Sequence, residues 1–220
     1  VVIKVMEYVL DKIGEDGLVD RSVTGFILET ASESPAPGGG SIAAVMGALG
    51  AALGTMVANL SAHKPGWDDR WEEFSDAAVR GQELVRELLY LVDEDTRSFN
   101  KVMEAFGLPK NTAEEKQLRT EAIQEATFYA TQVPFRVMKA SMAVFDLAGQ
   151  MSQTGNPNSV SDAGVGALAA RAAVLGAWLN VRINAASIKD RSRVEDLLKE
   201  AAGMAELARQ NEAAILETVN

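Results

Sequence analysis

The sequence predicts an all-α protein, a bundle of about six helices with a central apolar helix rich in alanine and glycine. Apolar residues recur at helical spacing along the whole chain, and no alternation of polar and apolar residues persists long enough to predict a strand. Apolar residues make up 47% of the 220 residues and aromatic residues only 6%. Such a chain can bury a sizeable core through small contact residues, which is typical of helical bundles.

Glycine, proline and capping residues divide the first part of the chain. A short helix and a loop that contains glycine are expected over residues 1–17, and Asp20 is expected to cap a helix that ends near Ser32. The stretch Ser34–Ser41 holds two prolines and three glycines, so it breaks the chain before the apolar helix begins.

The apolar helix is expected to end near residue 60. Ile42–Ala62 contains no charged residue, and Gly50 and Gly54 lie four positions apart within it. The length and lack of charge would suit a membrane span. Because most of the segment is weakly hydrophobic alanine and glycine, we instead predict a buried helix with small residues for close packing, and no membrane.

A long helix is expected over residues 68–106, ended by Gly107 and Pro109. Its inward-facing positions are predicted to be Leu84, Val85, Leu88, Leu91, Val92, Asp95, Phe99, Val102, Met103 and Phe106. Asp95 is the one acid among them, whereas Asp93 and Glu94 lie off this stripe and are expected to face water.

Asp95 is the candidate catalytic residue. A buried carboxyl group is costly unless it is paired or protonated, and burial raises its pKa towards the range that a general acid needs near neutral pH. The alternative is a structural aspartate that pairs with an arginine from another helix.

Three further helices are predicted in the second half of the chain. Asn111 or Thr112 is expected to cap the first, which Pro134 is expected to kink, and Ser161 is expected to cap the second. The three helices are expected over residues 112–150, 161–188 and 192–219.

Gly38, Gly39 and Gly40 precede Ser41 where the apolar helix opens. Glycines allow positive φ angles and a close approach of the backbone to a ligand, and a helix N-terminus offers free N–H groups to an anion or a carbonyl oxygen. The Gly-Lys-Ser/Thr ending of a P-loop is absent. These four residues form either a substrate-binding turn or a plain flexible entry into the helix.

Polar residues on the helix expected after Ser161 form a second candidate group. Asp162, Asn180 and Asn184 lie roughly along one face, and the two amides are one turn apart. They are either ligand contacts or a hydrogen-bond network in the core or across a subunit interface.

Lys110 and Arg119 are candidates for binding an anionic part of a ligand, or else they solvate the surface.

Composition narrows the classes of function. The chain has no cysteine and one histidine, so we predict no metal site, and the missing cysteine fits a reducing, cytoplasmic location. The net charge of −10 argues against a general nucleic-acid binder.

Several of these stretches resemble the formimidoyltetrahydrofolate cyclodeaminase / methenyltetrahydrofolate cyclohydrolase family. The hallmark is Ser34–Ser41 followed by the Ala/Gly helix. Other similar stretches follow in order over about residues 20–190: Leu91–Asp95 with Phe99, Leu108–Thr112, Glu114–Lys116, Arg119, Val133-Pro134, Ser161-Asp162, Asn180-Val181, Asn184 and Asp190.

The resemblance implies an all-helical homodimer or higher even oligomer that binds folate, with or without a polyglutamate tail, in a cleft near the subunit interface. It implies an acidic catalytic residue at Asp95, no cofactor, and conversion of 5-formimidoyltetrahydrofolate to 5,10-methenyltetrahydrofolate with release of ammonia. Gly38–Ser41, Asn180 and Asn184 would hold the pterin or the tail. A cyclohydrolase, and a non-catalytic helical dimerisation domain, are the alternatives.

The first residues resemble a segment that joins two domains. Val5-Met6-Glu7-Tyr8 is similar to the connection between the formimidoyltransferase and cyclodeaminase domains of bifunctional enzymes. This favours the cyclodeaminase reaction and implies a formimidoyltransferase domain in the same chain. Residues 1–19 would then be a remnant of the linker, and residues 20–220 the helical domain.

Overall fold

The computed structural model describes residues 17–219, and all regular secondary structure within them is helical. The predicted all-α bundle is confirmed, with six α-helices in the described part. The helix expected over the first residues, and the linker resemblance of Val5–Tyr8, lie outside it. The elements are η1 Leu18–Asp20, α2 Val23–Thr30, α3 Gly39–Ala62, η2 Asp68–Arg70, α4 Trp71–Gly107, α5 Ala113–Thr154, η3 Pro157–Ser159, α6 Val160–Ala186 and α7 Ser192–Val219.

Two of the predicted helix caps are wrong and one is confirmed. Ser22, not Asp20, caps α2, where its Oγ accepts from the N–H of Gly25 at 3.0 Å. Ser161 lies inside α6, because the 3₁₀ turn η3 leads directly into that helix at Val160. At α5, Thr112 accepts from the N–H of Glu115 and the Glu115 side chain accepts from the N–H of Thr112, both at 3.1 Å.

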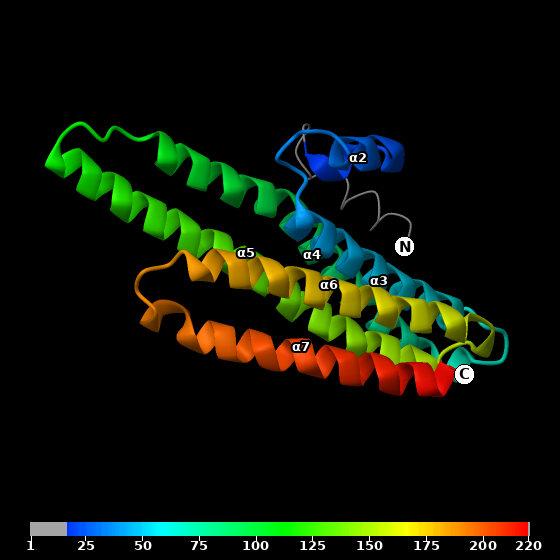
Figure 1. Cartoon of the computed structure of the whole chain (residues 1–220). Coiled ribbons are helices and arrows are strands. Elements are labelled where there is room, and N and C mark those ends of the chain that lie inside the picture. Colours follow the sequence, from blue (N-terminus) through cyan, green and yellow to red (C-terminus); the bar gives the residue numbers. More distant parts are fainter. Residues whose placement is uncertain (1–16, 220) are drawn as a thin grey trace.

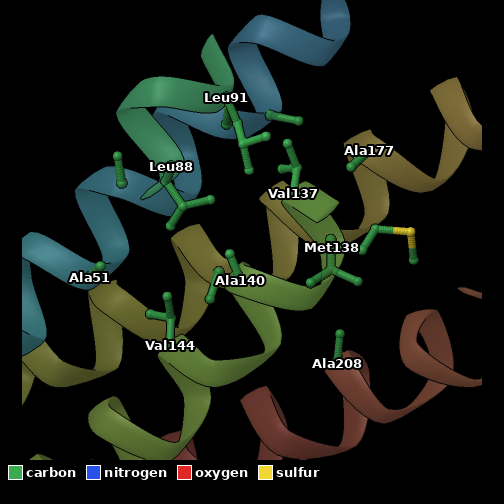
Figure 2. Packing of buried hydrophobic residues seen from close by; sticks show 14 of the residues in the cluster. Ala51, Leu88, Leu91, Val137, Met138, Ala140, Val144, Ala177 and Ala208 are labelled. Atoms are coloured by element: carbon green, nitrogen blue, oxygen red, sulfur yellow. The ribbon is translucent and has the colours of Figure 1, made fainter. Parts of the chain in front are cut away.

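The long helices pack side by side, and α2 lies at their edge, where Phe26 packs against the main core (Figure 1). α5 contacts α3, α4, α6 and α7, whereas α3 contacts α4, α5 and α6. Figure 2 shows side chains from these helices meeting in the core, with Leu88 and Leu91 of α4 facing α5. The ends of α4 and α5 that join through residues 108–112 project beyond the other helices (Figure 1).

Glycine brings the backbones of α3 and α6 together. A Cβ atom on Gly50 would lie 2.8 Å from the carbonyl oxygen of Gly166, and one on Gly166 would lie 3.1 Å from that of Gly50. Gly54 instead faces Leu147 of α5, whose Cδ2 would lie 2.8 Å from an added Cβ. The small residues of α3 therefore serve two different helix contacts.

Within the described part of the chain, two helices are long and apolar enough to cross a membrane by length and composition alone. They are Gly39–Ala62, with 61% of its most apolar window buried in the bundle, and Pro157–Ala186, with 44%. Core helices of soluble proteins pass the same test, so this is weak evidence for a span. Packing against α4, α5 and α6 accounts for the buried small residues of α3, whereas Leu49, Met56 and Leu60 stay exposed.

We expect Gly50→Ala to lower the free energy of unfolding by about 1–3 kcal/mol, because the added methyl group meets a backbone oxygen that cannot swing away. Gly203→Ala is the matched control, since an added Cβ there meets nothing within 4 Å and the position lies inside α7. The control should gain about 0.5–1 kcal/mol. Chemical denaturation of both variants tests this, and equal stability would refute the close approach of α3 and α6.

Candidate active site

A cleft of about 410 Å³ lies where the first turn of α3 meets the C-terminal third of α4, the N-terminal half of α5 and the C-terminal part of α6. A volume of this size can hold a small molecule. The lining residues are Pro35, Ala36, Gly38, Gly39, Gly40, Asp95, Thr96, Ser98, Phe99, Val102, Phe106, Ile123, Thr127, Ala130, Asn180, Asn184 and Ser187.

Asp95 is the acid in this cleft, and its partner is the first turn of α3. The Ser41 hydroxyl donates to Oδ2 of Asp95 at 2.9 Å. Burial raises the pKa of Asp95, and the hydroxyl and backbone N–H of Ser41 oppose that rise only in part. No ion pair to Asp95 occurs among residues 17–219. The side chain is therefore neither in bulk solvent nor locked against an arginine.

Gly40 is required for close approach rather than for an unusual backbone angle. A Cβ on Gly40 would lie 2.6 Å from Cγ of Asp95, whereas one on Gly39 would lie 3.5 Å from Nδ2 of Asn180, which is an ordinary contact distance. Within the described residues only Gly66, with φ of 83°, has a positive φ. The positive φ that glycine allows is not used at Gly38, Gly39 or Gly40, and the close approach is to the protein's own side chains.

Asn180 and Asn184 both line the cleft, as their shared helix face predicted. Nδ2 of Asn180 donates to the carbonyl of Gly176 at 3.0 Å, one turn back in α6. Nδ2 of Asn184 crosses to α5 and donates to the carbonyl of Ala130 at 2.7 Å. The structure thus brings Gly38, Gly39, Gly40, Asp95 and both asparagines to one cleft, with Ser41 bonded to Asp95 behind it.

Aromatic side chains form one wall of the cleft. Phe99 and Phe106 line it, with Val102 between them on α4. Phe99 is 38% exposed, Phe106 50% and Met103 53%, so the expectation that these three are buried is wrong. The helical spacing was right, but α4 and α5 project past α6 and α7 at this end (Figure 1), where no other helix of residues 17–219 covers them.

Three predicted ligand contacts lie away from the cleft lining. Asp162 is in the first turn of α6, 18 residues or about 27 Å along the helix from Asn180. Arg119 is near the outer end, where Nε and Nη2 donate to the carbonyl of Phe106 at 3.2 and 3.1 Å. Lys110 is exposed in the turn between α4 and α5. A role for these residues in binding substrate stays a prediction.

Asp93 and Glu94 are buried, so the expectation that they face water is wrong. Asp93 accepts from the N–H of Leu18 at 2.7 Å, which ties η1 to α4. Glu94 accepts from the Tyr129 hydroxyl, and from Nη1 of Arg97 at 2.9 Å. An arginine three positions after Glu94 was the sequence signal for this pair, but no sequence signal linked Glu94 to Tyr129.

The neighbouring acids Glu94 and Asp95 are tuned in opposite directions. Burial on its own would raise the pKa of Glu94, but hydrogen bonds from Tyr129 and Arg97 outweigh it and lower that pKa. The same bond raises the pKa of Tyr129 to about 12. Glu94 is held as a carboxylate away from the cleft, while Asp95 is the acid that can take up and release a proton.

Metal ligands are scarce around Asp95. Among residues 17–219 no cluster of three or more histidine, aspartate or glutamate side chains is suited to a metal ion. The polar groups that line the cleft with Asp95 are hydroxyls and amides, which fit a hydrogen-bonded organic ligand.

Together, the fold and the cleft define an all-α protein with one proton-exchanging acid in a pocket of ligand size. Residues 22–203 match the family model described as Formiminotransferase-cyclodeaminase, so the chain belongs to this family.

Relatives in this family are enzymes of folate metabolism by name. The chain is 41% identical to a methenyltetrahydrofolate cyclohydrolase of Methylorubrum extorquens over 91% of this chain and 96% of that protein. It is 35% identical to the formimidoyltransferase-cyclodeaminase of Rattus norvegicus, covering 93% of this chain but only 39% of that protein. A crystal structure of formiminotetrahydrofolate cyclodeaminase from Thermotoga maritima has the same fold, with a TM-score of 0.78, 28% identity, and coverage of 91% of this chain and 98% of that one.

The Asp95→Asn variant should be more stable than the unchanged protein at pH 7. Because burial raises the pKa of Asp95 in the folded state, the folded protein carries an unfavourable charge above that pKa. The cost fades as the pH falls through the folded pKa and is absent below the unfolded value of about 4. Thermal unfolding from pH 4 to 8 should show an advantage for the variant that grows with pH, and a constant difference would contradict this.

Proposed function

We propose that the chain catalyses ring closure or ring opening at the one-carbon bridge between N5 and N10 of tetrahydrofolate. The main support for this proposal is Asp95, an acid of raised pKa that accepts a hydrogen bond from Ser41. The cleft around it also contains two amide side chains and an aromatic wall. Membership of the family supports a folate substrate. The cyclodeaminase and cyclohydrolase reactions both place a proton-transfer group beside the same carbon.

In the cyclodeaminase reaction, N10 attacks the formimidoyl carbon carried on N5. The new C–N10 bond closes a five-membered ring, and the carbon becomes tetrahedral. Asp95 takes the proton that leaves N10 and delivers it to the amino nitrogen of the protonated formimidoyl group, after which the bond between the carbon and that nitrogen breaks, ammonia departs and the 5,10-methenyl cation remains. The cleft contributes orientation, because N10 and the carbon must be held together for ring closure.

In the cyclohydrolase reaction, water adds to the bridging carbon of 5,10-methenyltetrahydrofolate. Asp95 takes a proton from the water, and the C–N5 bond breaks as N5 gains a proton, which leaves 10-formyltetrahydrofolate. The 41% identity to a cyclohydrolase over 96% of its length favours this candidate. The Thermotoga structure supports the cyclodeaminase reaction. The animal relatives support it too, although this chain spans only about two fifths of their length.

Two assays on purified protein separate the reactions: ammonia release from 5-formimidoyltetrahydrofolate, and hydrolysis of 5,10-methenyltetrahydrofolate. The Asp95→Asn variant should lose about 10²–10⁴-fold in kcat for whichever reaction the protein catalyses, because the amide cannot exchange the proton. The variant should still unfold cooperatively. If the variant is nearly as active as the unchanged protein, Asp95 is not part of the mechanism. If the unchanged protein is inactive in both assays, the alternative of a non-catalytic helical domain is supported.

Neither reaction requires a metal or redox cofactor. A folate tail carries carboxylates, and Arg119 and Lys110 lie near the open end of the cleft, beyond Phe106. We propose this end as the exit for a glutamate or polyglutamate tail. A cytoplasmic location, and a formimidoyltransferase domain elsewhere in the chain, stay predictions.

We propose that two copies of the chain pair through α3 and α6. The two helices pack against each other, and each carries a stripe of exposed apolar residues. The larger ones are Leu49, Met56 and Leu60 on α3, and Val165, Leu168, Leu179 and Ile183 on α6. Leu179 and Ile183 directly precede the cleft residues Asn180 and Asn184, so such an interface would adjoin the cleft.

Sedimentation of the unchanged protein should therefore give the mass of a dimer or a higher even oligomer, and Leu179→Asp should shift it to monomer. A charge at this site is costly to bury between two subunits. Leu118→Asp is the matched control, because Leu118 is similarly exposed but lies on the projecting end of α5. An unchanged mass in Leu179→Asp would exclude this face.

A further inference from the structure

Pro134 creates a hydrogen-bond acceptor that α5 itself cannot satisfy. Proline has no backbone N–H, so the carbonyl of Ala130, four residues earlier in the same helix, loses its usual partner. Nδ2 of Asn184 on α6 donates to this carbonyl at 2.7 Å. Ala130 and Asn184 both line the cleft, so the carbonyl that α5 leaves without a donor receives its hydrogen bond from a side chain of the cleft.

This contact fixes which end of the Asn184 amide is available to a ligand. A carbonyl oxygen only accepts hydrogen bonds, so the NH₂ group must face Ala130 and the carbonyl Oδ1 must be the free end. Asn180 is set in the same way, because its Nδ2 donates to the carbonyl of Gly176. Among residues 17–219 no group donates to Oδ1 of either side chain.

We infer that Asn180 and Asn184 present a pair of hydrogen-bond acceptors that reads the donor edge of the pterin ring, with Pro134 acting as the positioning residue. The inference rests on the proposed folate substrate. The 2-amino group and the adjacent ring N–H of a pterin are neighbouring donors, and acceptors one helical turn apart can receive them. This edge would lie on α6, which directs the rest of the substrate towards Asp95 and the aromatic wall.

The link between Pro134 and Asn184 is testable by unfolding, without any folate. Asn184→Ala leaves the Ala130 carbonyl without its donor, so the unfolding equilibrium constant should rise about tenfold. In the Pro134→Ala background the restored helix N–H supplies that donor, and Asn184→Ala should change the constant less than about threefold. Asn180→Ala is the control, because its amide bonds within α6, and its effect should be the same in both backgrounds. Equal effects of Asn184→Ala in the two backgrounds would overturn the link.

The reading of the pterin edge is tested by calorimetric binding of tetrahydrofolate and of its 2-desamino analogue. The unchanged protein should bind the analogue at least about tenfold more weakly, since a buried acceptor then loses its donor. In Asn184→Ala the affinities for tetrahydrofolate and for the analogue should differ less than about threefold. In Pro134→Ala the difference should also fall, because the Asn184 amide is free to flip. If Asn184 and Pro134 had only a structural role, the ratio of the two affinities would be the same in the variants as in the unchanged protein.

The outcomes separate the inference from the proposed function. Equal discrimination in the unchanged protein and in Asn184→Ala overturns the reading of the pterin edge, even if tetrahydrofolate binds tightly. Absence of binding of tetrahydrofolate to the unchanged protein overturns the folate substrate and this reading together, while the unfolding cycle still decides the link between Pro134 and Asn184.

Discussion

The contact between the first turn of α3 and Asp95 of α4 is the constraint on which the cleft depends. A carboxyl group withdrawn from water needs hydrogen-bond donors, and Ser41 supplies them only if the helix start comes very close. That approach leaves no room for a side chain at Gly40. The glycines, the serine and the aspartate therefore form one unit, although 54 positions separate Ser41 from Asp95 in the chain.

Three consecutive acids on α4 show how position on a helix assigns chemistry. Successive residues point about 100° apart, so Asp93, Glu94 and Asp95 meet three different surroundings. Asp93 binds the backbone of η1, and Glu94 binds Tyr129 and Arg97. Burial raises the pKa of Asp95, and the donors of Ser41 offset that rise only in part, whereas hydrogen bonds from Tyr129 and Arg97 lower the pKa of Glu94. The pKa of each acid therefore depends on what its neighbours lack as much as on what they provide.

Stability is given up at the end of the bundle that holds the cleft. The projecting ends of α4 and α5 leave Phe99 and Phe106 partly exposed, which costs apolar burial but gives the cleft an aromatic wall. The raised pKa of Asp95 carries a similar cost at neutral pH. Close packing elsewhere, such as the meeting of α3 and α6 at Gly50 and Gly166, offsets these losses.

The sequence by itself determined the all-α class and the approximate helix ranges of the described residues, because local periodicity decides them. It limited the cap of α5 to Asn111 or Thr112, and the structure selects Thr112. It also selected Asp95, since an acid in an apolar stripe is visible in one dimension. Only the tertiary structure decided that Asp93 and Glu94 are buried and that Asp162 is far from the cleft. Those outcomes depend on which helix covers each face and how far it extends, and helical spacing within one segment contains neither fact.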